Sequence, residues 1–486
     1  MTSGTCESRF VLATSNGTGM GHLTRQICTA LALRQRGAEA VVFSMSAAVP
    51  VVRIHDLRAE YCPSYQRGWL PQSAWHGYLN DRLRAIVGEV AAKVVVFDGV
   101  VPYLGLLRAR AALPEVAFVW CRRGLWTPGA NTGSLRARPF FDVILEPGDL
   151  AGGADQGATS DLDDAIRLPP MSLLEHVTPL SRRDASAALG LDPDRPTALV
   201  TLGSGALNDP NTPGRAAILA ILAAPDWQVA VTRAHIAERA MSRVGDRRVV
   251  ELRGVYPLSA YLNAFDAAVS ASGYNTFHEL LFAGIPTVFV PRVSGTDDQV
   301  ARARWAADQG LSLVAEEANP ASVGARASQL CDPRVRADLR AACTGLARPS
   351  GSTVAARALA GLATEFRRHQ PRIDERLHTA ELTARATAVR LLGPAATSAI
   401  RHLLLRPAHP GPVRPVPVRL TAEATARDAA DHGQEVPGAL VMTERLDQEL
   451  LRARDPVEHV LEGSSAGYRA DRARITRRYY DVRANA

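Results

Sequence analysis

Ser270-Ala-Ser-Gly-Tyr-Asn-Thr-Phe-His-Glu279 is the stretch from which the fold is most readily predicted. Two segments follow it, Ala283-Gly-Ile-Pro-Thr-Val-Phe-Val-Pro291 and Asp297-Asp-Gln299. Together they predict a buried strand, a turn of small residues, the start of a helix, a second strand and a polar loop. Three loops can therefore meet at one edge of a sheet, where parallel α/β proteins bind their ligands.

Short apolar runs alternate with helix-length segments on both sides of this stretch. Such runs are typical of strands that are buried on both faces of a parallel sheet. We expect them at 10–14, 40–43, 94–97, 116–119 and 141–145, and again at 197–201, 228–232, 248–252, 267–270, 287–290 and 311–314. Helices are expected at 22–36, at 81–92 and across 320–366. The pattern predicts an α/β protein with two Rossmann-like, doubly wound domains that face a cleft.

Three parts are predicted along the chain: residues 1–170, 171–369 and 370–486. A Gly- and Asp-rich stretch and the Pro169-Pro170 pair separate the first two. The third part is expected to be a mainly helical extension with a proline-rich break at 407–417 and a basic end at 469–483. We favour a structural extension packed on the body, and a dimerisation arm, a lid over the cleft and a basic membrane contact stay open.

Charge and composition restrict the classes of function. The 486 residues are too many for one core, and the net charge of +7 comes almost entirely from arginine. Arginine and alanine enrichment indicates GC-rich coding, so the positive charge is weak evidence for nucleic-acid binding. No nucleic-acid partner is therefore expected. Lys93 is the one lysine and lies outside any Gly-x-x-x-x-Gly-Lys pattern, which argues against a lysine aldimine or a Walker phosphate loop. No apolar run reaches about 18 residues, so the cytoplasm is the expected location.

The cysteines do not indicate a metal or a disulfide framework. They are scattered, without a Cys-x-x-Cys pair or a histidine at ligand spacing: Cys6, Cys28, Cys62, Cys121, Cys331 and Cys343. We therefore propose no metal site and expect small buried side chains.

A glycine loop, Gly17-Thr-Gly-Met-Gly21-His22, follows the first predicted strand. Glycines there allow a tight turn and leave amide groups pointing at the sheet edge. A dinucleotide site would need Gly-x-Gly-x-x-Gly and a carboxylate after the second strand. The spacing here is Gly-x-Gly-x-Gly and the second strand has no carboxylate, so NAD binding is disfavoured.

His22 and Asp98 are the candidate catalytic pair. His22 opens the first helix, and its imidazole could take a proton from an attacking hydroxyl. Asp98 ends the third apolar run, so it could orient His22. Each has a structural alternative, a histidine bonded to backbone at a helix end and an aspartate that caps the next element. Arg122, Arg123 and Trp126 could line an acceptor cleft or belong to a solvated loop.

The glycine loop with His22, combined with residues 272–279 and Asp298-Gln299, resembles the GT-B nucleotide-sugar glycosyltransferases. The likeness is greatest to the MurG-like group, glycosyltransferase family 28, which adds N-acetylglucosamine to lipid I. It covers residues 9 to about 366 and is stronger in the second half. The MurG enzyme has two glutamines where this chain has Asp298 and Gln299, and the family usually has glycine at Met20.

This resemblance implies a role for each matching residue. Glu279 would bind the ribose hydroxyls, Val255 and Tyr256 after Gly254 would read the nucleobase, and Asp298 with Gln299 would bind sugar hydroxyls. The remaining donor residues would surround the diphosphate: Gly203, Ser204, Gly205, Ser272, Gly273, Asn275 and Thr276. Gly17, Thr18, Gly19 and Gly21 would form the loop on the acceptor side.

The implied activity is transfer of a hexose or N-acetylhexosamine, with UDP-GlcNAc favoured, to an acceptor hydroxyl. His22 would be the base, and helix amides would offset the charge of the leaving diphosphate without a metal, with inversion at the anomeric carbon. No cofactor is expected beyond the UDP-linked co-substrate. The acceptor would be lipid-linked, with a peripheral membrane contact, or a small secondary metabolite such as a nucleoside or an aglycone. Two alternatives are a non-hydrolysing UDP-sugar 2-epimerase and a non-catalytic scaffold.

Overall fold

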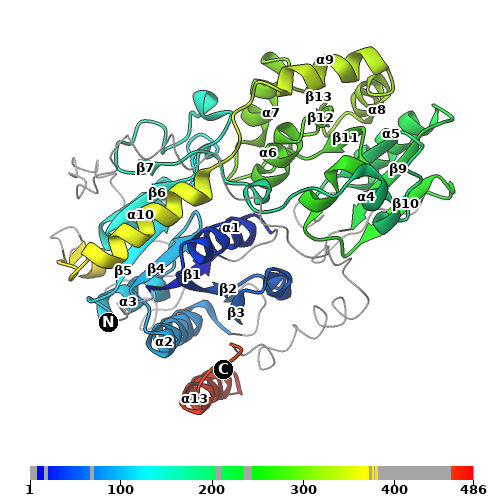
Figure 1. Ribbon diagram of the computed structural model, residues 1–486. Helices are drawn as coiled ribbons and strands as arrows, with labels where there is room; N and C mark the ends of the chain where they lie inside the picture. Colours follow the sequence, from blue (N-terminus) through cyan, green and yellow to red (C-terminus); the bar gives the residue numbers. More distant parts are fainter. Residues whose placement is uncertain are drawn as a thin grey trace, which may run out of the picture.

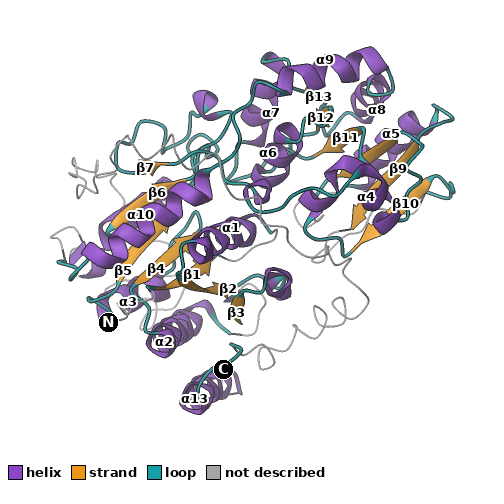
Figure 2. Ribbon diagram, viewed as in Figure 1, coloured by secondary structure: helices purple, strands orange, loops and turns teal. Residues whose placement is uncertain are grey.

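Two parallel β-sheets organise the chain, each with helices on its faces (Figures 1 and 2). The computed structural model describes residues 8–15, 20–65, 70–203, 210–233, 244–371, 375–376, 378–380 and 461–484. The prediction of two Rossmann-like domains is confirmed, because every strand pair in both sheets is parallel among these residues.

The first sheet has the order β3-β2-β1-β4-β5-β6-β7. Its central strands are continuous apolar runs, as parallel strands covered on both faces require. Two short edge strands, β3 and β7, were not expected from the sequence. The strands are β1 (Arg9–Thr14), β2 (Glu39–Ser44), β3 (Arg58–Tyr61), β4 (Val94–Asp98), β5 (Ala117–Cys121), β6 (Val143–Glu146) and β7 (Ile166–Arg167).

The second sheet has the order β10-β9-β8-β11-β12-β13. All six of its strands were expected, with small differences at their ends. They are β8 (Thr197–Thr201), β9 (Gln228–Arg233), β10 (Val249–Arg253), β11 (Ala267–Ser270), β12 (Thr287–Phe289) and β13 (Leu313–Val314). Because β8 and β12 both pair with β11, the loops after these three strands emerge side by side.

Helices cover both sheets, and α2 begins nine residues before the expected start at 81. In the first half they are α1 (Gly21–Gln35), α2 (Gln72–Val90) and α3 (Leu104–Ala112). The second half has α4 (Arg182–Leu189), α5 (Asn211–Leu222), α6 (Tyr274–Phe282), α7 (Gln299–Asp308), α8 (Pro320–Gln329), α9 (Pro333–Cys343) and α10 (Gly351–Glu365). Short 3-10 helices lie at Val49–His55, Thr132–Phe140, Gly152–Ala154, Leu173–Glu175 and Leu258–Ala264.

The last helix of the second half returns to the first. α10 packs on α1 and contacts β4, and Figure 1 shows it crossing the first sheet. One cluster of buried side chains also runs from Leu23 in α1 to Phe277 in α6, so the halves share apolar contacts. The division at residues 170 and 369 remains a prediction, and α10 belongs spatially to the first sheet.

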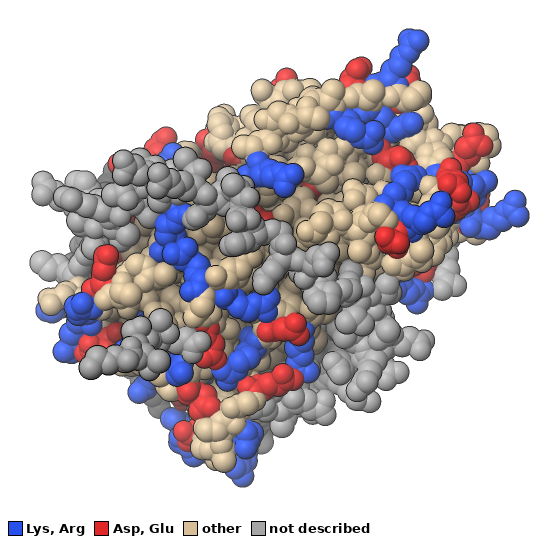
Figure 3. All heavy atoms as spheres, in the orientation of Figure 1, with Lys and Arg blue, Asp and Glu red and all other residues tan. Residues whose placement is uncertain are grey.

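The end of the C-terminal extension is a helix, α13 (Ala466–Ala484), which packs on α2. Leu461, Tyr468, Ile475 and Tyr479 join the apolar cluster of the first half. Most of the extension, including the proline-rich break at 407–417, lies outside the described residues. On the face drawn in Figure 3, the coloured basic side chains are interleaved with acidic ones.

Candidate active site

A pocket of about 540 Å³ lies between the two halves, and loops from both sheets form its wall. Eleven of the residues expected in the site line it: Gly21, His22, Arg123, Gly203, Val255, Tyr256, Gly273, Asn275, Thr276, Glu279 and Gln299. They come from the first half and the second half of the sequence. The fold therefore assembles one pocket from loops far apart in the chain.

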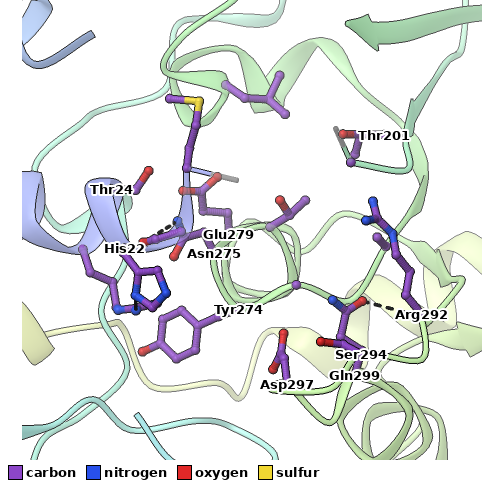
Figure 4. Close-up of a pocket in the computed structure, with 18 of the residues that line it drawn as sticks. His22, Thr24, Thr201, Tyr274, Asn275, Glu279, Arg292, Ser294, Asp297 and Gln299 are labelled. Atoms are coloured by element: carbon purple, nitrogen blue, oxygen red, sulfur yellow. Dashed lines mark hydrogen bonds between the residues drawn. The ribbon is translucent and has the colours of Figure 1, made fainter. Parts of the chain in front are cut away.

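His22 projects into this pocket from the start of α1 (Figure 4). Its Nδ1 lies 2.6 Å from Oδ1 of Asp98, which ends β4 and is fully buried. β1 and β4 are paired neighbours, so the start of α1 and the end of β4 lie at the same sheet edge. The pairing expected for these two residues is present in the structure.

Arg25 is a third member of this cluster that the sequence did not indicate. Its Nε donates to Oδ2 of Asp98 at 2.9 Å, and its Nη2 donates to Oδ1 at 2.6 Å. Arg25 lies one turn after His22, so both side chains lie on the face of α1 that meets Asp98. An arginine three residues after a glycine-loop histidine is the signal that could have revealed it.

Burial is the main cause that favours the neutral form of His22. Burial lowers the pKa of His22, and Arg25 and Arg123 lower it further, while Asp98 opposes them. Arg25 and His22 hold the pKa of Asp98 well below its usual range despite burial. Asp98 is anionic and accepts the Nδ1 proton. Arg25 Nη2 lies 2.7 Å from the same nitrogen, but a guanidinium is a donor and cannot take this proton. The Nε2 lone pair is then left to accept a proton.

The start of α6 forms the floor of the pocket on the opposite side. β11 ends at Ser270, Gly273 occupies the N-cap position, and no described side chain caps the helix. Free amides and the positive end of the dipole make such a start favourable for an anion. Asn275 donates from Nδ2 to the Gly21 carbonyl at 3.4 Å, which joins α6 to the glycine loop.

Glu279 lies one turn further along α6 and is 7% exposed. It lines the pocket, as the resemblance implied for a donor-binding residue. Burial raises the pKa of its carboxyl to about 8. A carboxyl held in this way can accept hydrogen bonds from hydroxyl groups of a ligand.

The adjacent residues Asp297 and Asp298 differ in whether they line the pocket. Asp298 is the N-cap of α7, and its Oδ1 accepts from the Ala301 amide at 2.9 Å. It does not line the pocket, whereas Asp297 and Gln299 do. An aspartate directly before a helix is a typical N-cap, so the helix-start pattern could have separated the two.

Three further expected residues lie behind the pocket wall. Arg122 is 1% exposed and binds Asp164 at 2.7 Å, and Trp126 is fully buried. They therefore do not line the acceptor cleft as expected, because ion pairing and apolar packing hold them in the interior. Ser272 is also buried, and its hydroxyl donates to the Gln299 carbonyl at 2.9 Å. It supports the loop that carries Gln299.

Five expected residues lie outside the described parts of the chain: Gly17, Thr18, Gly19, Ser204 and Gly205. Besides Arg25, the sequence missed Tyr274, Arg292 and Asp297, which all line the pocket. Tyr274 donates from its hydroxyl to the Gly148 carbonyl at 2.7 Å and so connects α6 to the first half. Tyr274 follows the predicted turn of small residues, Arg292 lies shortly after the predicted strand at 287–290, and Asp297 opens the predicted polar loop. Those positions were the available signals.

The described residues have three further features that concern disulfides, metals and membranes. Their cysteines are free, and no group of three His, Cys, Asp or Glu side chains among them is placed to hold a metal ion. Among their helices, none combines the length and apolarity needed to cross a membrane.

Two Rossmann-like sheets facing one pocket are the GT-B architecture, and solved structures of glycosyltransferases support that fold. The spinosyn forosaminyltransferase SpnP superimposes with a TM-score of 0.54 at 17% identity, over 74% of this chain and 100% of that one. The calicheamicin glycosyltransferase CalG4 gives 0.50 at 16% identity, over 74% and 99%. The chain belongs to glycosyltransferase family 28, the MurG-like group.

Sequence relatives carry this assignment. The "Glycosyltransferase family 28 C-terminal domain" matches residues 241–330. A UDP-N-acetylglucosamine--N-acetylmuramyl-(pentapeptide) pyrophosphoryl-undecaprenol N-acetylglucosamine transferase of Cutibacterium acnes is 32% identical over 69% of this chain and 92% of its own length. Relatives of the same name from Nocardioides sp. (32%) and Frankia casuarinae (28%) match over 39% and 50% of this chain. The chain spans 49% and 65% of their lengths.

Proposed function

We propose that the protein transfers a hexose or N-acetylhexosamine from a nucleotide diphosphate sugar to an acceptor hydroxyl. One observation carries this proposal: His22, backed by Asp98, and the open start of α6 with Glu279 face the same pocket from opposite halves of the chain. A base and an anion-binding helix start are the two groups that such a displacement needs.

In the proposed step the acceptor oxygen attacks the anomeric carbon and forms the new C–O bond. The bond from this carbon to the diphosphate oxygen breaks, and its electron pair leaves with the nucleoside diphosphate. His22 takes the acceptor proton on Nε2, while Asp98 stabilises the imidazolium. The start of α6 offsets the charge that develops on the diphosphate, so the proposed displacement needs no metal. Because the acceptor attacks opposite the leaving diphosphate in a single step, the anomeric centre is inverted.

UDP-GlcNAc is the favoured donor, because the relatives from Frankia casuarinae and Cutibacterium acnes are named as UDP-N-acetylglucosamine transferases. In the proposed binding mode Glu279 accepts from the ribose hydroxyls, and Val255 and Tyr256 lie against the nucleobase. Gln299 is placed for the sugar hydroxyls, and Asp297 replaces Asp298 beside it, since Asp298 is engaged as an N-cap.

The acceptor is proposed to enter along the wall of the first half. Met20, Val100, Val101 and Tyr103 give that wall an apolar character. An acceptor with an apolar body next to its reactive hydroxyl fits such a surface, either a lipid-linked sugar or a small aglycone. A lipid-linked acceptor would place the protein at the inner face of the membrane, and a small one in the cytoplasm.

A donor and acceptor screen read by mass spectrometry tests the proposal. Wild-type protein should give a product heavier than the acceptor by one sugar residue. His22→Ala should lose turnover by a factor of about 10² to 10⁴ with unchanged donor affinity, as expected for loss of a general base. Full turnover by His22→Ala would remove His22 from the mechanism.

The donor site and the epimerase alternative need separate measurements. Glu279→Ala should weaken UDP binding in calorimetry, and an unchanged affinity would count against the proposed donor site. For the epimerase, NMR of UDP-N-acetylglucosamine with protein alone should show a new epimer. We expect none, because family membership supports transfer to an acceptor.

A further inference from the structure

We propose that Arg292 binds the diphosphate of the donor and offsets the charge gained by the leaving nucleoside diphosphate. This inference rests on the proposed function, because it assigns a ligand group to a side chain of the same pocket. Arg292 lies three residues after β12 and lines the pocket with Thr201, Gly203 and Gln299. Figure 4 draws Arg292 beside Thr201, on the other side of α6 from His22.

The side chain of Arg292 bridges two strand ends. Its Nη2 donates to the Leu202 carbonyl, just after β8. Its Cζ would lie 2.8 Å from a Cβ added to Gly203, so the guanidinium occupies the space that this glycine leaves free. Gly203 also has a φ of +84°, a conformation that side-chain-bearing residues rarely adopt. Both constraints favour glycine at this position.

This bridge passes the place where α6 begins. β8 and β12 flank β11 in the sheet, and β11 leads directly into α6. A side chain that extends from the end of β12 to the end of β8 therefore crosses the carboxyl end of β11. The guanidinium and the open start of α6 can then contact the same anion from two directions.

Arg292 has hydrogen-bonding capacity beyond the Leu202 contact. Its Nε is buried and has no partner among the described residues, which omit 204–209. Burial lowers the pKa of Arg292, and Glu317 only partly offsets this effect. A partly buried guanidinium is stabilised by an anion with several acceptor oxygens. A diphosphate has that chemistry, and the uncharged sugar and nucleoside do not.

The proposed role of Arg292 in diphosphate binding can be distinguished from a purely structural role. If Arg292 served only to hold β12 to β8, its loss would loosen the pocket for every part of the donor. A diphosphate ligand predicts instead a loss confined to molecules that carry phosphates. Comparing a nucleoside diphosphate with its nucleoside separates the two roles.

The experiment is calorimetry of UDP and uridine with wild type, Arg292→Met, Arg292→Lys and Arg253→Met. Arg253 is the matched control, because it is half-exposed on β10, pairs with Glu251 at 2.8 Å and does not line the pocket. TDP and thymidine are measured as a second pair.

For Arg292→Met we expect the Kd of UDP to rise about tenfold or more and the Kd of uridine to stay unchanged, since a charged hydrogen bond is lost. Arg292→Lys should lie between this variant and wild type, and Arg253→Met should match wild type. Unchanged uridine binding also shows that the Arg292→Met pocket is folded.

An unchanged ratio of UDP to uridine affinity in Arg292→Met would overturn the inference, and so would a parallel loss of both. Wild-type protein that binds UDP no more tightly than uridine would overturn it as well, while leaving nucleoside recognition in place. Wild-type protein that binds neither pair would instead contradict the proposed function itself.

Discussion

Arg123 and Asp297 form an ion pair across the cleft, with Arg123 on the loop after β5 and Asp297 on the loop before α7. Arg302 pairs with the same carboxylate at 2.9 Å and also with Asp149 of the first half. These two arginines hold the pKa of Asp297 well below its usual range, although it is buried. One carboxylate in the pocket thus links both halves.

Breaking this pair should destabilise the protein. Arg123→Met leaves Asp297 with one of its two cations, so we expect a loss of about 1–3 kcal/mol in the free energy of unfolding. Denaturant unfolding measures it. The matched control is Arg368→Met. Arg368 lies 3.6 Å from Glu115, whose side chain is 65% exposed, so we expect the free energy of unfolding to change by less than about 0.5 kcal/mol. Equal effects in the two variants would show that the cleft pair is not a structural link.

The pH dependence of activity should show a neutral His22. A general base works when it is unprotonated, and its pKa is lowered from its usual 6.5 by burial, Arg25 and Arg123. The acid limb of kcat/KM should therefore fall below pH 6.5, with activity lost as pH drops through the lowered pKa. A pH–rate profile measures this limb. An acid limb above pH 6.5 would mean that the effect of Asp98 on the His22 pKa outweighs the effects of burial, Arg25 and Arg123.

The contribution of the Arg25 charge to that shift can be tested by substitution. Arg25→Met removes a cation that lies against both His22 and Asp98, so Asp98 acts on His22 without competition. The acid limb should move to higher pH than in wild type. Circular dichroism provides the folding control, because Arg25 is buried. An unmoved limb in a folded variant would contradict the electrostatic role of Arg25.

Glu279 should make stability depend on pH. Its carboxyl has a pKa of about 8 when folded and an ordinary value of 4.5. The folded state binds the carboxyl proton more tightly than the unfolded state does, so the proton stabilises the folded protein. This stabilisation is complete below pH 4.5 and is lost as pH rises through 8. Glu279→Gln removes the titrating carboxyl. The melting temperature of the variant should therefore fall less than that of wild type between pH 5 and pH 9. Parallel curves would contradict the raised pKa.

The C-terminal helix should be required for stability of the first half. Glu60 and Arg82 are fully buried, and Glu60 accepts from Arg472 of α13 at 2.8 Å and from the Leu461 amide at 2.8 Å. Arg472→Ala removes one cation from this buried carboxylate, so we expect a loss of about 3–5 kcal/mol in unfolding free energy.

Arg477→Ala is the control for that prediction, since Arg477 is exposed on the same helix. It should change the unfolding free energy by less than about 0.5 kcal/mol. If the two variants were equally stable, the contact of α13 with the first half would have no measurable role in folding.

Most strands could be predicted from the sequence, because buried parallel strands consist of continuous apolar runs. β3 and β7 could not, since short edge strands such as Arg58–Tyr61 and Ile166–Arg167 carry charged residues and gain their order from a neighbouring strand. Within the site, His22, Asp98 and Glu279 were indicated by their places at strand ends and helix starts. Arg25 and Arg292 were missed, because their positions after the histidine and after a strand do not show which carboxylate or carbonyl each side chain will meet.

Local patterns along the chain were enough to establish the two-sheet class, the glycine loop before α1 and the open start of α6, because periodicity and small residues act over short distances. Long-range packing was needed to establish which of Asp297 and Asp298 faces the pocket, that Arg122 and Trp126 lie in the interior, and that Arg25 shares Asp98 with His22. Those outcomes depend on contacts between residues tens to hundreds of positions apart, where burial and charge pairing fix the direction of each side chain.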